Sequence, residues 1–182
     1  DLDDLYKGSY VDATYGGEAL RRTYEKIRAL PQEQSDNVGR VICVNQWLLE
    51  EGGLEEGSTP RLLDVGSGLG VFPAAMKTAG WQCTGLDPDP RAAEHLRKVV
   101  DVEGLCGDFL TQKPKAQYEL VTFNKVLEHV MEPVTMLAQT RAWLSNKAYI
   151  YIELPDAEGA QKEGYHREEF FLEHHHVFSR AS

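Results

Sequence analysis

The amino-acid sequence predicts a single α/β domain built on a doubly wound, mostly parallel sheet. Short apolar segments alternate with amphipathic segments of ten to fifteen residues from residue 61 onward, and the first apolar segment ends in the glycine-rich stretch Gly66-Ser67-Gly68-Leu69-Gly70. Alternating strands and helices favour right-handed crossovers, which place helices on both faces of a parallel sheet. At 182 residues the chain is long enough for one domain with a hydrophobic core.

A helical segment is expected ahead of this alternation. Residues 1–16 are polar and aromatic and show no clear period, whereas the sequence over 17–30 and over 35–53 has apolar residues at helical spacing. Pro31 ends the first of these helices, and Gly52 ends the second. We expect residues 1–55 to form an N-terminal helical lid and residues 56–182 to form the core.

Five strands and three helices are expected in the core. The strands are predicted over 61–65, 81–87, 102–108, 118–124 and 147–155, and the helices over 71–80, 87–100 and 132–146. Asp89 is the expected N-cap of the second core helix, with Pro90 in its first turn. Cys83 and Cys106 lie inside predicted strands, so we expect both to be core residues.

Composition and charge exclude several classes of function. The 29 acidic and 19 basic residues give a formal net charge of −10, which opposes binding to a phosphate backbone, so no nucleic-acid partner is expected. The three cysteines are far apart and form no Cys-x-x-Cys motif, which favours a reducing, cytoplasmic location over a disulfide framework. The longest apolar runs are too short to span a membrane, so no membrane partner is expected.

The glycine-rich stretch is expected at the edge of the sheet where doubly wound folds bind ligands. Gly66, Gly68 and Gly70 have the spacing G-x-G-x-G, whereas the dinucleotide fingerprint places its third glycine one position later, where Val71 stands. Taken alone, the pattern is also consistent with glycines that only turn a tight corner between strand and helix.

Three further strand ends support a ligand site. The second strand ends at Asp87, whose carboxylate can accept both hydroxyl groups of a ribose. Asp108 and Phe109 follow the third strand, an acid beside an aromatic ring that suits adenine, and the fourth strand runs into Asn124. Asp64 and Asp108 stand where a diphosphate would lie or pass, which favours a ligand that carries positive charge.

The stretches LLDVGSGLG, GLDPDP, GD and FNKVLEHV, in this order, resemble the class I methyltransferases that use S-adenosyl-L-methionine. The resemblance covers roughly residues 35–155, and the order of four motifs makes it specific. The tail over 167–179 is similar, more loosely, to a segment of bacterial small-molecule methyltransferases of this class. The resemblance implies S-adenosyl-L-methionine as the cofactor and a small molecule as the methyl acceptor.

The resemblance also implies which residues hold the methionyl end of the cofactor. Gly66, Ser67 and Gly68 would lie against the methionyl group. Asp64 would order this turn and the cofactor's ammonium group, directly or through water, and the carbonyl of Asn124 would accept from the same amino group.

At the adenosine end, the resemblance implies that Asp87 holds the ribose hydroxyls and that Pro88 flanks the adenine. Asp108 would take the adenine amine, and Phe109 would cover the ring or bond it through its backbone. Arg40, on the second N-terminal helix, is a candidate partner for the methionyl carboxylate, and a solvated position on the helix surface is the alternative for this side chain.

A hydroxyl or acidic-carbon acceptor needs a general base near neutral pH, which favours histidine. His129 follows the fourth strand, near the expected position of the methyl group, although a capping or packing role is the alternative. His174 belongs to the run His174-His175-His176, for which we expect a lid or substrate-facing role. No metal site is predicted, because consecutive histidines on a helix point in different directions.

Two other functions remain open from the sequence. An NAD-dependent dehydrogenase would also place Asp87 on a ribose, and a non-catalytic binding or scaffold domain would keep the fold without turnover. Residues after Pro155 do not show the antiparallel hairpin that completes this sheet in the family, so the fifth strand is expected at an exposed edge. That edge, over 149–152, is a candidate surface for a homodimer.

Overall fold

A computed structural model of the chain describes residues 17–53, 57–163 and 174–179, and the statements below concern these residues. They form a five-stranded parallel sheet with the strand order β3-β2-β1-β4-β5. The strands are β1 Arg61–Val65, β2 Gln82–Asp87, β3 Glu103–Cys106, β4 Tyr118–Asn124 and β5 Leu144–Glu153. The order reverses between β1 and β4, so the carboxyl ends of these two strands mark the expected ligand site.

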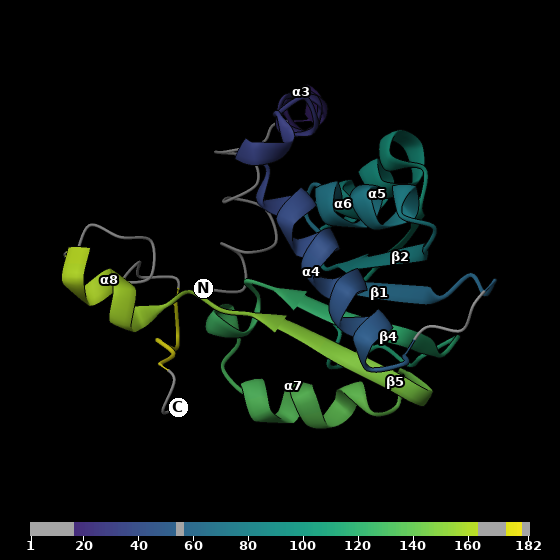
Figure 1. Ribbon diagram of the computed structural model, residues 1–182, viewed down its shortest axis with the longest axis vertical. Helices are drawn as coiled ribbons and strands as arrows, with labels where there is room; N and C mark the ends of the chain where they lie inside the picture. The colour runs from purple at the N-terminus through teal and green to yellow at the C-terminus, as the bar shows by residue number, and fades with distance from the viewer. Residues whose placement is uncertain (1–16, 54–56, 164–173, 180–182) are drawn as a thin grey trace.

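Helices cover both faces of the sheet, as Figure 1 shows. One face carries α4 (Asp36–Glu50), α5 (Val71–Thr78) and α6 (Pro90–His95), the last of which continues as a π-helical turn, η3 (Leu96–Val100). The other face carries α7 (Pro133–Thr140). The remaining helices are α3 (Gly17–Arg28), the short turns η2 (Gln32–Gln34) and η4 (Leu127–His129), and α8 (Ala157–Glu163). The predicted doubly wound fold is confirmed.

Alternation along β1 builds a separate core on each face. Leu62 is fully buried and packs with Val44 and Leu48 of α4, whereas its neighbour Leu63 is fully buried in the cluster on the α7 side. Successive side chains of a strand point to opposite faces, so a strand buried on both faces has apolar residues at consecutive positions. The sequence of β1 therefore predicts its central place in the sheet.

The predicted third core helix, over 132–146, is too long. The helix α7 ends at Thr140, and β5 already begins at Leu144. The cause is Trp143, which is buried and stacks on Phe109 with ring centroids 5.4 Å apart. Its backbone N–H bonds the carbonyl of Thr140, and its carbonyl accepts from Tyr118, so the chain turns into the sheet at this residue.

Of the two cysteines predicted for the core, only Cys83 is buried. The prediction for Cys106 is wrong, because this residue ends β3, which is the last strand on its side of the described sheet and leaves its side chain exposed. The strand β5 lies at the opposite edge of the described sheet, as expected, and pairs there with β4 alone. Pairing of two copies through β5 stays a prediction.

The α4 helix covers part of this edge. Trp47 packs edge-on against Tyr149 of β5, with ring centroids 4.9 Å apart, while Ile152 remains 38% exposed. Within the described residues, no helix is long and apolar enough to cross a membrane.

Gly104 in β3 marks the closest approach between the sheet and α6. A Cβ atom at this position would lie 2.3 Å from the backbone oxygen of Ala93, which is too close for any side chain. We expect Gly104→Ala to lower the free energy of unfolding by about 1–3 kcal/mol, because overpacking forces the backbone to shift. Urea unfolding followed by circular dichroism measures this change.

The matched control is Gly39→Ala in α4, where a Cβ would meet no atom within 4 Å. Since glycine inside a helix is destabilising relative to alanine by about 0.5–1 kcal/mol, this variant should be slightly more stable than the parent chain. Equal stability of the parent and Gly104→Ala would show that β3 and α6 are not in close contact.

Candidate functional site

The glycine turn follows β1 and leaves its backbone uncovered on one side. Gly66 has a φ of 69°, and a Cβ at this position would lie 2.7 Å from Cγ2 of Val126, so glycine is required. Gly68 also has a positive φ, of 49°, but a Cβ there would meet nothing within 4 Å. The turn is therefore closed toward Val126 and open at Gly68, where a ligand can approach the main chain.

Asp87, at the end of β2, holds the glycine turn in place. Its Oδ2 accepts the N–H of Gly68 and its Oδ1 accepts the N–H of Asp89, each at 2.9 Å. The side chain is only 9% exposed, and burial raises its pKa. A carboxylate can accept about four hydrogen bonds. Two acceptor positions thus remain for the hydroxyl groups of a ribose.

Asp64 joins the glycine turn to β4 from beneath. Its carboxylate accepts from Ser67 Oγ at 2.9 Å, from Thr122 Oγ1 at 2.7 Å and from Asn124 Nδ2 at 2.9 Å. Burial raises the pKa of Asp64 to about 6, although these three hydrogen bonds act in the opposite direction. The geometry supports the predicted role in ordering the turn.

The side-chain oxygen of Asn124 is buried beside this carboxylate. Its Oδ1 has no hydrogen-bond partner within the described residues. A buried acceptor without a partner is costly in a protein interior and is commonly satisfied by a ligand or by water. The sequence predicted the backbone carbonyl of Asn124 as the acceptor for the cofactor's amino group, and the side chain is a second candidate.

The structure separates the two residues that follow β3. Asp108 is exposed and accepts the N–H of Leu110 at 2.9 Å, so its carboxylate remains accessible, as does Pro88 across the site. Phe109 is only 3% exposed and packs edge-on against Phe123 at 5.6 Å. Its ring therefore belongs to the core and does not cover an adenine, which corrects one of the two predicted roles. The backbone of Phe109 remains a candidate.

Arg40 is not on a solvated helix surface. Its guanidinium forms a two-pronged ion pair with Glu153 at the end of β5, in which Nη2 lies 2.5 Å from Oε1, and both side chains are mostly buried. The hydrogen bond to Glu153 raises the pKa of Arg40. Tyr151 donates its hydroxyl proton to the same carboxylate at 3.2 Å. Contact with a methionyl carboxylate would have to compete with Glu153.

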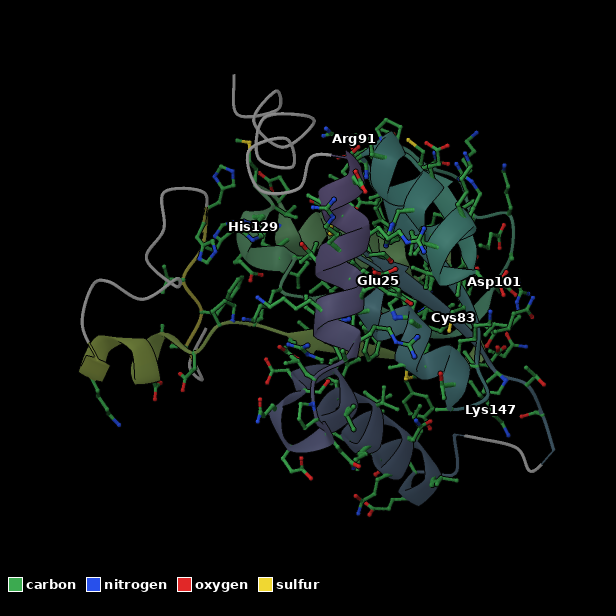
Figure 2. The ribbon with its side chains drawn as sticks, turned by 90° about the horizontal axis from the view of Figure 1, so that it is seen from above. Glu25, Cys83, Arg91, Asp101, His129 and Lys147 are labelled. Carbon is green, nitrogen blue, oxygen red and sulfur yellow. The ribbon has the colours of Figure 1, made fainter. Side chains whose placement is uncertain are left out.

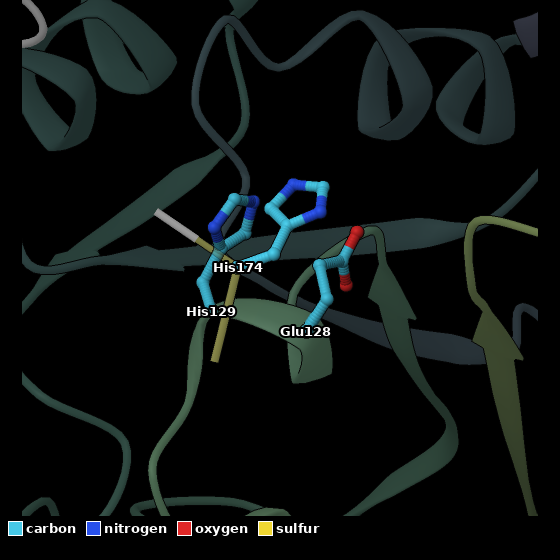
Figure 3. A group of neighbouring side chains, drawn as sticks. All are labelled: Glu128, His129 and His174. Atoms are coloured by element: carbon cyan, nitrogen blue, oxygen red, sulfur yellow. The ribbon is translucent and has the colours of Figure 1, made fainter. Parts of the chain in front are cut away.

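The predicted catalytic residues His129 and His174 lie together (Figure 3). Their rings meet edge to face with centroids 4.6 Å apart, although 45 positions in the chain separate them. The backbone carbonyl of Glu128 brings the tail to this place, since it accepts the N–H groups of His175 at 2.7 Å and of His176 at 3.2 Å. The tail here is irregular, so the assumption that these histidines form a helix is wrong.

Glu128 completes this cluster, and no pattern in the sequence distinguishes it from other acidic residues. Its side chain is 1% exposed, burial raises its pKa, and Oε2 has no hydrogen-bond partner within the described part of the chain. One ligand atom from each of Glu128, His129 and His174 lies within 4.8 Å of the others. The cluster thus brings one buried carboxylate and two imidazoles within reach of a common ligand or proton.

A family model described as a methyltransferase domain matches residues 21–182. The chain belongs to this methyltransferase family. Among curated proteins, it is 30% identical over 117 residues to the ubiquinone biosynthesis O-methyltransferase of Bordetella bronchiseptica, a match that covers 58% of this chain and 46% of the relative. The enzyme of the same name from Pseudomonas aeruginosa is 29% identical over 98 residues, which cover 50% of this chain and 41% of the relative. The chain spans about half the length of these curated relatives.

Solved structures show the same fold as this methyltransferase domain. A putative methyltransferase from Bacillus halodurans superposes with a TM-score of 0.59 at 16% identity, over 75% of this chain and 63% of that chain. An amino pentose methyltransferase from Micromonospora echinaspora, solved with S-adenosylmethionine bound, superposes with a TM-score of 0.57 at 19% identity, over 74% and 55% of the two chains.

The raised pKa of Asp64 gives the domain a testable dependence on pH. The ordinary pKa of an aspartate, 3.8, describes the unfolded chain, whereas the folded group titrates at about 6. The protonated carboxyl group therefore contributes its full stability below 3.8, and this contribution is lost as the pH rises through about 6. The difference corresponds to at most about 3 kcal/mol.

We expect Asp64→Asn to lose less stability than the parent chain between about pH 4.5 and about pH 7.5, because it lacks this ionisation. Urea unfolding at both pH values gives the comparison, and taking the difference between the two proteins cancels the other titrating groups. An identical pH dependence in both would show that Asp64 is not buried as an acid.

Proposed function

We propose that this domain transfers the methyl group of S-adenosyl-L-methionine to an oxygen atom of a small-molecule acceptor. The observation that carries the proposal is the position of Asp87, which is nearly buried, fixes the open glycine turn through Gly68 and retains acceptor positions at the rim of the sheet. A cationic sulfonium cofactor fits the acidic surroundings of this turn better than a diphosphate does, because Asp64 and Asp87 are close to it.

The proposed cofactor lies across the carboxyl ends of β1, β2 and β3. Gly66, Ser67 and Gly68 contact its methionyl part, and Asn124 accepts from its amino group. Asp64 acts on this end by holding the turn. Arg40 takes part only if the cofactor's carboxylate competes with Glu153 for its guanidinium.

The adenosine end of the cofactor extends toward β3. Asp87 accepts the ribose hydroxyls, and Pro88 flanks the adenine. Asp108 accepts from the adenine amine, and the backbone of Phe109 faces the ring edge while its side chain stays in the core. We infer from these proposed contacts that the sulfur lies near the end of β4, close to η4 and His129.

In the proposed reaction, the acceptor oxygen forms a bond to the methyl carbon while the bond from that carbon to sulfur breaks, and its electron pair stays on sulfur. The hydroxyl proton of the acceptor passes to a ring nitrogen of His129 or of His174. The remaining contribution of the protein is to align the two reactants and to exclude water. Of the N-terminal segment expected as a lid, α4 packs on the sheet and residues 1–16 lie outside the described residues, so α3 is the described part that suits the second task.

Two observations favour oxygen as the accepting atom. The curated relatives from Bordetella bronchiseptica and Pseudomonas aeruginosa are both named as O-methyltransferases. A hydroxyl must lose a proton during transfer, and the histidine pair beside Glu128 supplies groups that can receive it. A non-catalytic scaffold would not need His129 and His174 near the cofactor. Loss of methyl transfer with unchanged cofactor binding, when both histidines are replaced by glutamine, would therefore support an enzyme over a scaffold.

Cofactor binding is the first test. We expect isothermal titration calorimetry to show binding of S-adenosyl-L-methionine and of S-adenosylhomocysteine, and no binding of NAD. Both ligands should also raise the melting temperature, since only ligands of the folded state stabilise by mass action. Binding of NAD without binding of either sulfur compound would support a dehydrogenase and contradict the proposal.

The variant Asp87→Asn should weaken cofactor binding by about 1.5–3 kcal/mol, the range for hydrogen bonds to a charged group. Its matched control is Asp101→Asn. Asp101 is an exposed acid in a left-handed conformation that asparagine also tolerates, and Figure 2 shows it on the far side of the molecule from His129. Unchanged affinity in Asp87→Asn would mean that the ribose is bound elsewhere.

Transfer to a small molecule is tested separately. Protein is incubated with cofactor that carries a tritiated methyl group, and total RNA, DNA, cell protein and a small-molecule extract are offered side by side. We expect label in the extract alone, because a net charge of −10 opposes binding to polyanions. Label confined to a polymer fraction would overturn the proposed acceptor class.

A further inference from the structure

The most informative group outside the cofactor contacts is the cluster of the buried Glu128 with the half-buried His129 and His174. The first two residues belong to η4, directly after β4, and the third comes from the tail. Figure 3 shows the carboxylate and both imidazoles pointing into one space above η4. The sequence predicted no metal site because it treated the histidines as neighbours on one helix.

We propose that Glu128, His129 and His174 bind a divalent transition-metal ion of the zinc type. Two imidazole nitrogens and one carboxylate oxygen are a donor set that such ions prefer, whereas magnesium and calcium prefer oxygen donors alone. Three protein ligands also leave a position open for a further oxygen, as in catalytic zinc sites.

The unpartnered oxygen of Glu128 is an independent reason for a ligand here. The side chain is 1% exposed, and Oε2 lacks a hydrogen-bond partner within the described residues. The carboxylate is attracted by His174 and Lys125 and bonds its own backbone, but these interactions provide no hydrogen-bond donor for Oε2 itself. A buried carboxylate oxygen without such a donor has lost its hydration, and native structures pair such atoms with a cation or a donor. A metal ion in this position satisfies that oxygen.

The distances within the cluster suit a site that closes around an ion. Two atoms bonded to one tetrahedral zinc ion at about 2.0–2.2 Å lie about 3.3–3.6 Å apart. The three ligand atoms here lie within 4.8 Å of one another. Binding of an ion therefore draws the half-buried imidazoles inward by about 1 Å.

The backbone keeps the two parts of the site together before an ion binds. The carbonyl of Glu128 accepts the N–H groups of His175 and His176, and Nε2 of His176 lies 3.2 Å from the carbonyl oxygen of Met131. These contacts dock the tail on the η4 segment, so His174 reaches Glu128 without further folding. The ion is bound by a site that is largely prepared, which favours affinity.

The role of the ion toward the acceptor rests on the proposed function, whereas its binding does not. An open position near the expected methyl group fits an acceptor hydroxyl, and coordination to a divalent ion lowers the pKa of a bound hydroxyl. With the ion bound, the hydroxyl proton would leave to solvent, and the oxygen would bond to the methyl carbon as the bond from that carbon to sulfur breaks. This route replaces the proton transfer to His129 or His174 described above for the chain without an ion, because the two histidines then serve as ligands.

The test uses Co²⁺ as a spectroscopic probe and Zn²⁺ as its competitor, on the whole chain after treatment with a chelator. We expect one Co²⁺ per chain, with visible absorption bands that disappear when Zn²⁺ is added. Loss of even an outer-shell partner costs about 10- to 100-fold in metal affinity. Glu128→Gln and His174→Ala should therefore each weaken Co²⁺ binding at least about tenfold.

The matched control is His175→Ala, which removes an exposed neighbouring imidazole outside the cluster, keeps the backbone N–H that bonds the carbonyl of Glu128, and should leave Co²⁺ affinity unchanged. Far-ultraviolet circular dichroism checks that each variant is folded, and His174→Ala, at a half-buried tail position, still decides the question if Glu128→Gln unfolds. Parent-like binding in folded Glu128→Gln or His174→Ala, equal weakening in His175→Ala, or no binding at millimolar Co²⁺ each overturns the metal site.

Titration of S-adenosylhomocysteine into the same samples keeps the two proposals distinguishable. Cofactor binding without Co²⁺ binding refutes the metal site and leaves the proposed function intact. Co²⁺ binding without cofactor binding refutes the proposed function and supports the metal site.

Discussion

The carboxylate of Asp64 connects the parts of the molecule that make the site. Three donors from two strand ends converge on it, Ser67 of the glycine turn and Thr122 and Asn124 of β4. The strand order reverses between β1 and β4, so this one buried group spans the point where a doubly wound sheet opens to ligands. Its burial is unfavourable for a charge, and the three hydrogen bonds offset part of that cost.

From Asp64 the support extends outward through backbone contacts. The glycine turn that Ser67 anchors is held on its other side by Asp87, through the N–H of Gly68. Two carboxylates thus fix a loop that is otherwise open at Gly68, where a Cβ atom would contact nothing within 4 Å. A loop held in this way is preorganised, which lowers the entropy lost when a cofactor is bound.

Much of the fold could be predicted from the sequence because its signals are local. Leu62 and Leu63 are apolar at consecutive positions of β1, which indicates burial on both faces, and the glycine turn identifies the first crossover. The end of α7 could not be predicted, because it depends on Trp143 meeting Phe109 across 34 positions of the chain. Exposure of Cys106 likewise depends on β3 lying at an edge, which is a property of strand order.

Some residues of the candidate site could likewise be predicted from the sequence, and others could not. Asp64 and Asp87 could be selected because strand ends meet at one edge of a parallel sheet, whatever the rest of the chain does. The inward direction of Phe109 and the burial of Glu128 depend on tertiary packing, and neither residue type indicates it. Arg40 illustrates the difficulty most clearly, since its partner Glu153 is 113 positions away.

That separation also bears on how the chain is made. During synthesis, α4 leaves the ribosome long before β5, which supplies Glu153 to Arg40 and Tyr149 to Trp47. Until then the apolar side of α4, with Ile42 and Leu49 exposed even in the finished fold, has an incomplete surface to pack on. Early-made helices in this position are exposed to aggregation and to chaperones, because contacts between distant segments form late. Addition of β5 to the sheet is thus also the step that protects α4.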